Sequence, residues 1–367
     1  MAVLITGATG FLGIRLLGLL LAQQKPIIAL TNRQSRTRIE GLQQALRQTG
    51  HPEPLVNSAD QWVSLIDIEL AENRLGLDPD TYNRLASETE EIWHSAACTS
   101  LAPRSSRIHR INVDGTRAIL ALATEAARIN AHPPLLRHVS TAFVAGGRRS
   151  GVVTEDELTD AFGFVNAYEE SKYDAELMVR QWAAARDACA VVLRPSILVS
   201  DQPAPGGHAQ PLHFMMGLAA LAIAALQKGT SARACFRLPS SAAAHINLMQ
   251  VDHAAELMVS AAAHQTGPGT ATFHISHPDE VPLTTVTELV ESVLPLDVQL
   301  VPEMPDVPTD LERVAYDTIT GFLPYAFFHR HYDRTGLRSQ GLDRSLAPVT
   351  VEYLRRGLTH PNQQPVG

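Results

Sequence analysis

The feature that most constrains the fold is a glycine-rich turn at the start of the chain. The apolar run 2–6 predicts a buried strand, and residues 14–23 predict a helix. Between them lie Gly7, Gly10 and Gly13, in the spacing G-x-x-G-x-x-G. A strand, a glycine turn and a helix in this order are typical of a dinucleotide-binding unit, in which the turn and the helix N-terminus hold phosphate.

Each glycine of the turn has an expected task. Gly7 permits the sharp turn, Gly10 lets the backbone approach the pyrophosphate, and Gly13 lets the helix pack close to the strand. A packing turn without a ligand is the alternative. We expect the residues of the turn to contact the dinucleotide: Gly7, Thr9, Gly10, Phe11, Leu12 and Gly13.

Strands and helices alternate from residue 2 to about residue 200. This alternation predicts an α/β fold of the Rossmann type, with a doubly wound parallel sheet and right-handed crossovers. Further strands are expected at 26–31, 63–67, 91–94, 136–140 and 190–193, and further helices at 33–48, 77–88, 113–130 and 168–186.

Beyond Pro195 the pattern changes. Residues 202–207 read as a loop, and the apolar run 214–226 as a helix that either packs in the core, which we favour, or lines a channel for an acyl chain. Residues 247–263 are expected to return to the sheet, 283–294 to form a helix, and the tail from Pro302 to be less regular.

The end of the second expected strand indicates which dinucleotide is bound. An Asp or Glu about 20 residues after the glycine turn holds the ribose 2′-hydroxyl of NAD. Here the place is taken by Thr31, Asn32 and Arg33, and an arginine suits the 2′-phosphate of NADP. We therefore expect NADP(H) with Asn32 and Arg33 at the 2′-phosphate, while Arg36 and Arg38 stay open as alternatives.

With this cofactor, we expect residues 1–200 to form an NADP-binding Rossmann domain to which elements at about 235–280 return. Residues 201–367 are expected to be mainly a smaller, substrate-binding part.

Tyr168 and Lys172 stand four residues apart and so share one face of the expected helix 168–186. A nearby ammonium is expected to lower the pKa of the phenol from its usual value of about 10, so that proton donation to an alkoxide becomes feasible. Lys172 can also bind the nicotinamide ribose. Ser140 and Thr141 follow the fifth expected strand, where a hydroxyl can donate to a substrate oxyanion or simply cap the turn, and we favour Thr141.

Other expected strand ends face the same crevice. Asp67 and Ile68 can meet the adenine, although a turn role is as open for the aspartate. Asn112 can hold a water or the backbone. The remaining candidates for cofactor contact are the small residues after the fourth strand and the end of the sixth: Ser95, Ala96, Ala97, Pro195 and Ser196.

Composition excludes several classes of function. The net charge of −8 argues against a nucleic-acid partner. Three widely spaced cysteines suggest neither a disulfide framework nor a zinc site, which fits a reducing cytoplasm. His329 and His331 lie two residues apart, with nothing nearby in the sequence to complete a metal set. No signal peptide is visible, and the apolar run 11–22 is too short to span a membrane.

Taken together, the motifs resemble those of the extended (atypical) short-chain dehydrogenase/reductase superfamily, and within it the thioester reductase and fatty acyl reductase branch. The resemblance covers residues 3 to about 285. The matching stretches are Thr6–Gly13, Leu75–Leu77, His94–Ala97, Asn112–Thr116, Ser140–Val144, Asn166–Lys172, Arg194–Ile197 and Ile246–Asp252.

The resemblance implies a catalytic set of Thr141, Tyr168 and Lys172 and an acyl thioester substrate, held on a carrier protein's phosphopantetheine arm or on coenzyme A. Hydride from NADPH attacks the thioester carbonyl, and the thiohemiacetal collapses to an aldehyde and a thiol; some members reduce the aldehyde to an alcohol. An extended-family enzyme acting on a ketone, an alcohol or a nucleotide sugar, epimerases included, is the first rival. A nucleotide sensor without catalysis is the second.

The chain departs from this branch in two ways. Such reductases are often the last domain of a large synthase, whereas this chain starts near the first strand and shows no carrier segment, so it is expected to act in trans. Its negative charge does not favour docking of an acidic carrier protein, so a local basic patch is expected.

Overall fold

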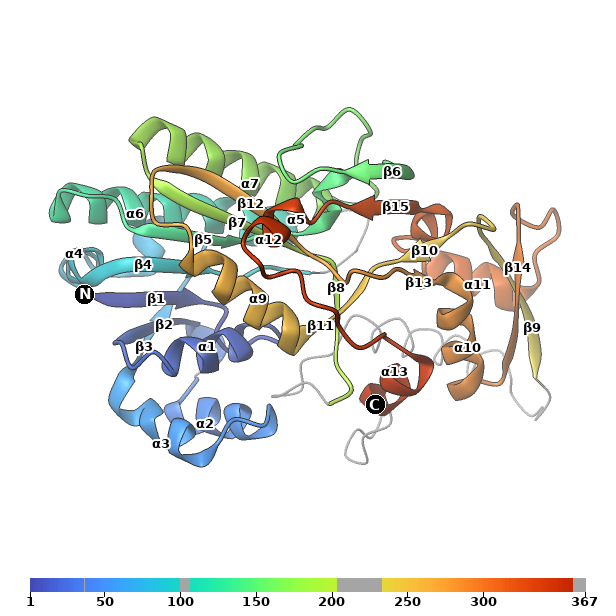
Figure 1. Cartoon of the computed structure of the whole chain (residues 1–367), viewed down its shortest axis with the longest axis horizontal. Coiled ribbons are helices and arrows are strands. Elements are labelled where there is room, and N and C mark those ends of the chain that lie inside the picture. The colour runs from blue at the N-terminus through green and yellow to red at the C-terminus, as the bar shows by residue number, and fades with distance from the viewer. Residues whose placement is uncertain (36, 100–105, 203–232, 359–367) are drawn as a thin grey trace.

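A seven-stranded parallel sheet forms the centre of the molecule (Figure 1). The structure is a computed structural model and describes residues 1–35, 37–99, 106–202 and 233–358. The order of the strands is β12-β7-β5-β4-β1-β2-β3. Their bounds are β1 Ala2–Thr6, β2 Ile27–Asn32, β3 Val63–Ile68, β4 Thr89–His94, β5 Leu135–Val139, β7 Cys189–Pro195 and β12 Gly269–Ile275. The doubly wound, Rossmann-type fold expected from the sequence is confirmed.

Helices cover both faces of the sheet (Figure 1). Successive side chains of a strand point to opposite faces, and β1 shows this directly. Val3 and Ile5 pack in the apolar core on one face, whereas Ala2 and Leu4 pack in the core on the other. The first core includes α1 Gly13–Leu21, α2 Ile39–Gln48, α3 Glu53–Trp62 and α9 Val251–Ala263. The second includes α4 Pro79–Glu88, α6 Gly115–Asn130 and α7 Ala167–Arg186.

The strand order reverses direction between β1 and β4. The chain runs outward from β1 through β2 to β3, and then crosses back to β4 on the other side of β1. Ligands of open parallel sheets bind at such a reversal, beyond the carboxyl ends of the strands. The glycine turn follows β1, and Ser95 follows β4, so the expected site lies at this point.

Two expectations about elements were wrong. Residues 33–48 do not form one helix, because a short 3₁₀ turn at Arg33–Ser35 precedes α2, and the unexpected α3 follows. Residues 247–263 add no strand to the central sheet. β11 Leu248–Gln250 pairs with β8 Ile197–Val199 outside that sheet, and α9 is followed by β12, which pairs with β7 in it. The helix expected at 113–130 is confirmed as α6, which follows directly on a π-helical turn at Arg110–Asp114. The expected helix 214–226, and the expected loop from residue 203 on, lie outside the described residues.

The C-terminal part is built from short strand pairs and helices beyond one end of the sheet (Figure 1). Its tail carries more regular structure than expected. The pairs are β9 Ala234–Pro239 with β14 Leu296–Val301, β10 His245–Ile246 with β13 Val281–Pro282, and β15 His329–Tyr332 with β6 Ser150–Val153. The helices there are α10 Leu283–Val293, which confirms the helix expected at this place, α11 Asp310–Thr318 and α13 Val351–Leu358. Two further helices belong to the sheet domain: α12 Thr335–Ser339 packs against β12, and α5 Ser106–His109 precedes α6. No helix within the described ranges has both the length and the apolar character that crossing a membrane requires.

Candidate active site

The glycine turn leaves no room for side chains. Gly7 has a φ of +74°, and a Cβ there would lie 2.8 Å from the backbone nitrogen of Ala96. A Cβ on Gly13 would lie 1.8 Å from the carbonyl oxygen of Gly7, so Gly13 permits the turn to fold on itself, in addition to bringing α1 close. In the described part of the chain, the N–H groups of Phe11, Leu12 and Gly13 find no backbone or side-chain acceptor. They are free to donate to a phosphate, as the N-terminus of a helix commonly does.

A hydrogen-bond chain joins the strands on the two sides of the reversal. The Thr6 hydroxyl accepts from the N–H groups of Ser95 and Ala96 at 3.2 and 3.1 Å, and contacts Nδ1 of His94 at 2.8 Å. Nε2 of His94 contacts the Thr116 hydroxyl at 3.0 Å. The N–H groups of Ser95 and Ala96 are therefore already hydrogen-bonded within the protein and are not available to a ligand. The small side chains of these residues allow a ligand to lie close to the backbone. Ala97 follows them in the same segment.

Thr141 and Tyr168 lie next to one another. Thr141 follows β5, is buried, and its hydroxyl lies close to the phenol of the half-buried Tyr168 in the first turn of α7. The same hydroxyl accepts from the Phe143 N–H at 3.3 Å and donates to the Pro195 carbonyl at 3.4 Å. Ser140, by contrast, donates to the buried carboxylate of Glu176 at 2.7 Å. Of the two candidate hydroxyls, the one at Thr141 faces the phenol.

The expectation that Lys172 lowers the pKa of Tyr168 was wrong. Burial raises the pKa of the phenol to about 12, against a smaller lowering by the hydrogen bond to Thr141. Lys172 is buried, and its ammonium donates to the Val139 carbonyl at 2.7 Å. Burial lowers the pKa of Lys172 to about 8, opposed by the Glu176 carboxylate. Tyr168 is thus protonated at neutral pH, as a proton donor must be.

Two neutral imidazoles lie close to Lys172. Burial, with the lysine charge as a smaller cause, lowers the pKa of His94 to about 3 and that of His138 well below its usual value. Their rings are 5.5 Å apart. They therefore add no second positive charge beside the ammonium.

A buried ion pair holds α7 against the sheet. Glu176 and Arg194 are fully buried, and the guanidinium donates to both carboxylate oxygens, at 2.7 and 3.0 Å. Glu176 lies one turn after Lys172, and Arg194 lies near the end of β7. The pair thus fixes α7 relative to the strand ends.

Several expected cofactor residues already have partners. The side chain of Asn112 is hydrogen-bonded to the N–H and the carbonyl of Cys98, at 2.7 and 3.0 Å, and to the Ser171 hydroxyl at 2.9 Å. Of the two roles expected for Asn112, holding a water or holding the backbone, the structure shows the second. The hydroxyl of Ser196 is buried and has no partner in the described part of the chain, which leaves it available to a ligand at the end of β7.

The residues expected at the 2′-phosphate lie exposed after β2. The Arg33 guanidinium donates to the Gly76 carbonyl at 3.2 Å, and the Asn32 side chain accepts from the Gln34 N–H at 2.8 Å. Asp67 accepts from Thr31 at 2.7 Å, whereas Ile68 is buried in the core. Arg36 lies outside the described residues, and Arg38 is exposed. A phosphate can reach these exposed side chains, and their positions do not show which arginine would bind it.

A set of residues around α7 was missed by sequence reasoning. The Tyr325 hydroxyl donates to Glu169 at 2.7 Å and accepts from Asn166 at 2.9 Å, and its ring meets the edge of Phe143 at 5.1 Å. The buried guanidinium of Arg330 lies 5.3 Å from the Phe143 ring. The C-terminal part is thereby attached to the first turn of α7 and to the segment after Thr141. Asn166 with a glutamate three residues later is a helix-start signal; Tyr325 and Arg330 carry no local signal.

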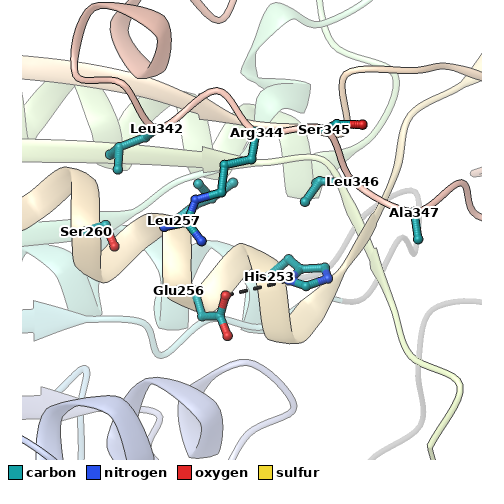
Figure 2. A pocket seen from close by; sticks show the side chains of 9 residues that line it. All are labelled: His253, Glu256, Leu257, Ser260, Leu342, Arg344, Ser345, Leu346 and Ala347. Carbon is teal, nitrogen blue, oxygen red and sulfur yellow. Dashed lines mark ion pairs between the residues drawn. The ribbon is translucent and has the colours of Figure 1, made fainter.

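A groove lies away from these residues, between α9 and the segment 342–347 (Figure 2). Its volume is about 230 Å³, and Arg344 reaches from the segment toward the helix. None of the residues expected at the dinucleotide or at the catalytic pair lines it. The lining residues are His253, Glu256, Leu257, Ser260, Leu342, Arg344, Ser345, Leu346 and Ala347.

The chain is similar to known reductases in sequence. Residues 5–258 match a family of NAD-binding proteins described as male sterility protein. Carboxylic acid reductase of Mycobacterium marinum is 28% identical over 298 residues, which are 75% of this chain and 24% of that protein. The chain spans about a quarter or less of the length of the first curated relatives that it matches.

Solved structures share the fold at low identity. The terminal R domain from the myxalamid PKS-NRPS biosynthetic pathway superposes with a TM-score of 0.73 at 22% identity, over 97% of this chain and 89% of that one. UDP-glucose 4-epimerase from Bifidobacterium longum, in complex with NAD+ and UDP, superposes with a TM-score of 0.65 at 16% identity, over 98% and 97%. A reductase and an epimerase thus share this architecture.

Proposed function

The chain belongs to the male sterility protein family of NAD-binding proteins and is an oxidoreductase of the extended short-chain dehydrogenase type, and on this premise we propose that it reduces an acyl thioester with NADPH. The family binds NAD(P), and the preference for NADPH is part of the proposal. The thioester is held on a carrier protein or on coenzyme A, and an aldehyde or an alcohol is released.

The observation that carries the proposal is the closeness of the Thr141 hydroxyl to a protonated Tyr168 at the end of β5. Reduction of a carbonyl builds negative charge on its oxygen, which needs a donor placed beforehand. Two hydroxyls beside one another, one of them with a pKa of about 12, can donate to that oxygen without having lost their protons at neutral pH.

The residues around the reversal fit a dinucleotide. The cradle at Gly7 and Gly13, which a Cβ would fill, and the free N–H groups after it suit the pyrophosphate. Arg33 would hold the 2′-phosphate, and Lys172 the nicotinamide ribose. Asp67, Ile68, Asn112, Pro195 and Ser196 stay proposed as further cofactor neighbours, together with the segment Ser95–Ala97. When bound, NADPH supplies the hydride that reduces the thioester carbonyl.

Within this site the chain's own residues orient the substrate and move a proton. Thr141 and Tyr168 bind the carbonyl oxygen and polarise it. Tyr168 donates its proton to that oxygen as negative charge develops on it. Lys172, whose ammonium donates to the Val139 carbonyl, holds the nicotinamide ribose in this proposal.

The sequence relatives favour a thioester over the rival substrates. The relative from Mycobacterium marinum is named a carboxylic acid reductase, and the myxalamid structure is a terminal R domain of a PKS-NRPS pathway. The epimerase shares the fold alone, at 16% identity. From the carboxylic acid reductase and the terminal R domain, we infer a carrier-bound substrate.

The experiment that tests the proposal offers the protein NADPH with acyl thioesters of coenzyme A and of pantetheine, and separately with ketones and a UDP-sugar. We expect NADPH oxidation with release of free thiol only from the thioesters. Oxidation with a ketone, or interconversion of the sugar, while no thioester of any chain length releases thiol, would favour the rival.

A further inference from the structure

Three potential metal ligands converge in the C-terminal part from segments far apart in the sequence. His245 lies on β10, Glu280 immediately precedes β13, and His331 lies on β15. One ligand atom of each side chain lies within 4.8 Å of those of the other two. The neighbouring sequence offers no partner that completes a metal set with His331, and the fold brings these partners in from distant segments.

The distance between His331 and Glu280 is close to the separation of neighbouring ligands around a metal ion. Nδ1 of His331 lies 3.5 Å from Oε1 of Glu280, which is longer than a good charge-assisted hydrogen bond. Around a tetrahedral zinc ion, with bonds of about 2.0–2.1 Å, neighbouring ligand atoms are about 3.3 Å apart. The exposed His331 side chain can rotate to complete the approach.

The other oxygen of the carboxylate is already held. Oε2 of Glu280 accepts from the side chain of Asn247 at 3.2 Å. Asn247 is buried and is itself fixed by two hydrogen bonds to the backbone of His277, at 2.8 and 2.9 Å. An outer partner that orients a ligating carboxylate in this way is typical of metal sites.

Both ring nitrogens of His245 face backbone carbonyl oxygens, and a neutral ring can donate a hydrogen bond to only one of them. Its Nδ1 lies 3.2 Å from the Ala243 carbonyl, and its Nε2 lies 3.2 Å from the Arg330 carbonyl. A neutral imidazole has a hydrogen on only one nitrogen, so one contact sets a lone pair against a carbonyl oxygen. A cation beside that nitrogen removes the repulsion, while the other N–H donates to its carbonyl, as in ligating histidines generally.

We propose that His245, Glu280 and His331 form a binding site for one divalent transition-metal ion, with zinc as its occupant. Two imidazoles and one carboxylate are ligands that zinc accepts, and a water or the nearby Arg330 carbonyl completes four-coordination. The site is a structural one, because it joins β10, the start of β13 and β15 at a single point. Arg330, next to His331, packs on Phe143, so the ion steadies the strand that contacts the segment after Thr141.

The test is a zinc titration of the full chain after treatment with a chelator, followed by calorimetry and by thermal unfolding. We compare wild type with H331A, whose side chain is exposed, and E280Q, which keeps the shape of the carboxylate. The control is H253A: His253 forms another exposed His–Glu pair, 3.6 Å from Glu256 (Figure 2), where no third ligand lies near among the described residues.

Wild type and H253A are expected to bind one high-affinity equivalent of zinc and to unfold at a higher temperature with it. H331A and E280Q should bind at least about 10- to 100-fold more weakly, the loss typical of an outer-shell change, and should show no thermal shift. Absence of zinc binding by wild type overturns the proposal. So does wild-type affinity in either H331A or E280Q, and the three side chains then form no metal site.

Discussion

The hydroxyl of Thr141 lies close to the phenol of Tyr168, which brings the end of β5 next to the first turn of α7. Two contacts hold this part of α7 in place: the Asn166–Tyr325 hydrogen bond at its start and the buried Glu176–Arg194 ion pair two turns later. The proton donor is thus held in place before any ligand arrives.

Replacing Tyr168 by Phe should abolish most turnover and spare cofactor binding. Only the hydroxyl is lost, and a positioned proton donor contributes about 10²- to 10⁴-fold to the rate. Turnover is measured by NADPH oxidation, and NADPH affinity by fluorescence titration of the same samples. Wild-type turnover in Y168F would remove Tyr168 from the mechanism. Loss of turnover with intact binding also argues against a nucleotide sensor.

Lys172 should make stability depend on pH in the alkaline range. Its pKa falls from 10.5 in the unfolded chain to about 8 in the folded protein. Between these values the unfolded chain binds the extra proton, so the lysine stabilises the fold as pH rises, by at most about 1.4 kcal/mol per pH unit. Below about pH 8 this contribution is lost.

The measurement is urea unfolding of wild type and K172M from pH 7 to pH 10.5. The free energy of unfolding of wild type should rise relative to that of K172M across this window. The lost hydrogen bond to the Val139 carbonyl shifts the comparison by a constant and does not alter its slope. A difference that stays flat with pH would show that Lys172 is not buried as described.

Gly13→Ala should disrupt the glycine turn. The added Cβ would lie 1.8 Å from the Gly7 carbonyl oxygen, so the turn must open. We expect loss of NADPH binding and a lower unfolding temperature. The matched control is Gly41→Ala in α2, where nothing lies within 4 Å of the added Cβ, and where removing a helical glycine stabilises by about 0.5–1 kcal/mol. Equal behaviour of the two variants would contradict the close packing at Gly13.

Arg33→Ala should reduce discrimination between the two nicotinamide dinucleotides. A hydrogen bond to a charged group contributes about 1.5–3 kcal/mol, so NADPH affinity should fall about 10- to 100-fold while NADH affinity is unchanged. Arg47→Ala, which removes an exposed arginine paired with Glu53, serves as the control. If R33A keeps its preference for NADPH, Arg36 or Arg38 reads the phosphate; if wild type has no preference, the assignment of NADP fails.

The sequence was most informative where the chemistry is local. The strand, turn and helix around Gly7 and Gly13 depend on neighbouring residues, so spacing alone predicts them, and the Tyr168–Lys172 spacing predicts a shared helix face. The pKa of Tyr168 depends on burial, which spacing does not report. β12, with seven residues, lies within the elements at about 235–280 that were expected to return, but its bounds were not predicted, because the alternation had been followed only to about residue 200.

Contacts between distant segments were beyond the reach of sequence patterns. Tyr325 reaches Asn166, and His331 meets His245 and Glu280, only because the C-terminal strands fold back on the sheet domain. Neither a helical nor a strand period links such positions. The residues that surround the catalytic pair and the proposed metal site therefore became visible only in the fold.

The most direct test of the central claim is a turnover with NADPH that carries deuterium at the transferable position. The protein is incubated with an acyl thioester, and thiol and product are quantified together by mass. We predict one deuterium at the former carbonyl carbon and one free thiol for each NADPH consumed if an aldehyde is released, and a second deuterium and a second NADPH if an alcohol is released. Thiol release without deuterium in the product, or NADPH oxidation without thiol release, would contradict thioester reduction.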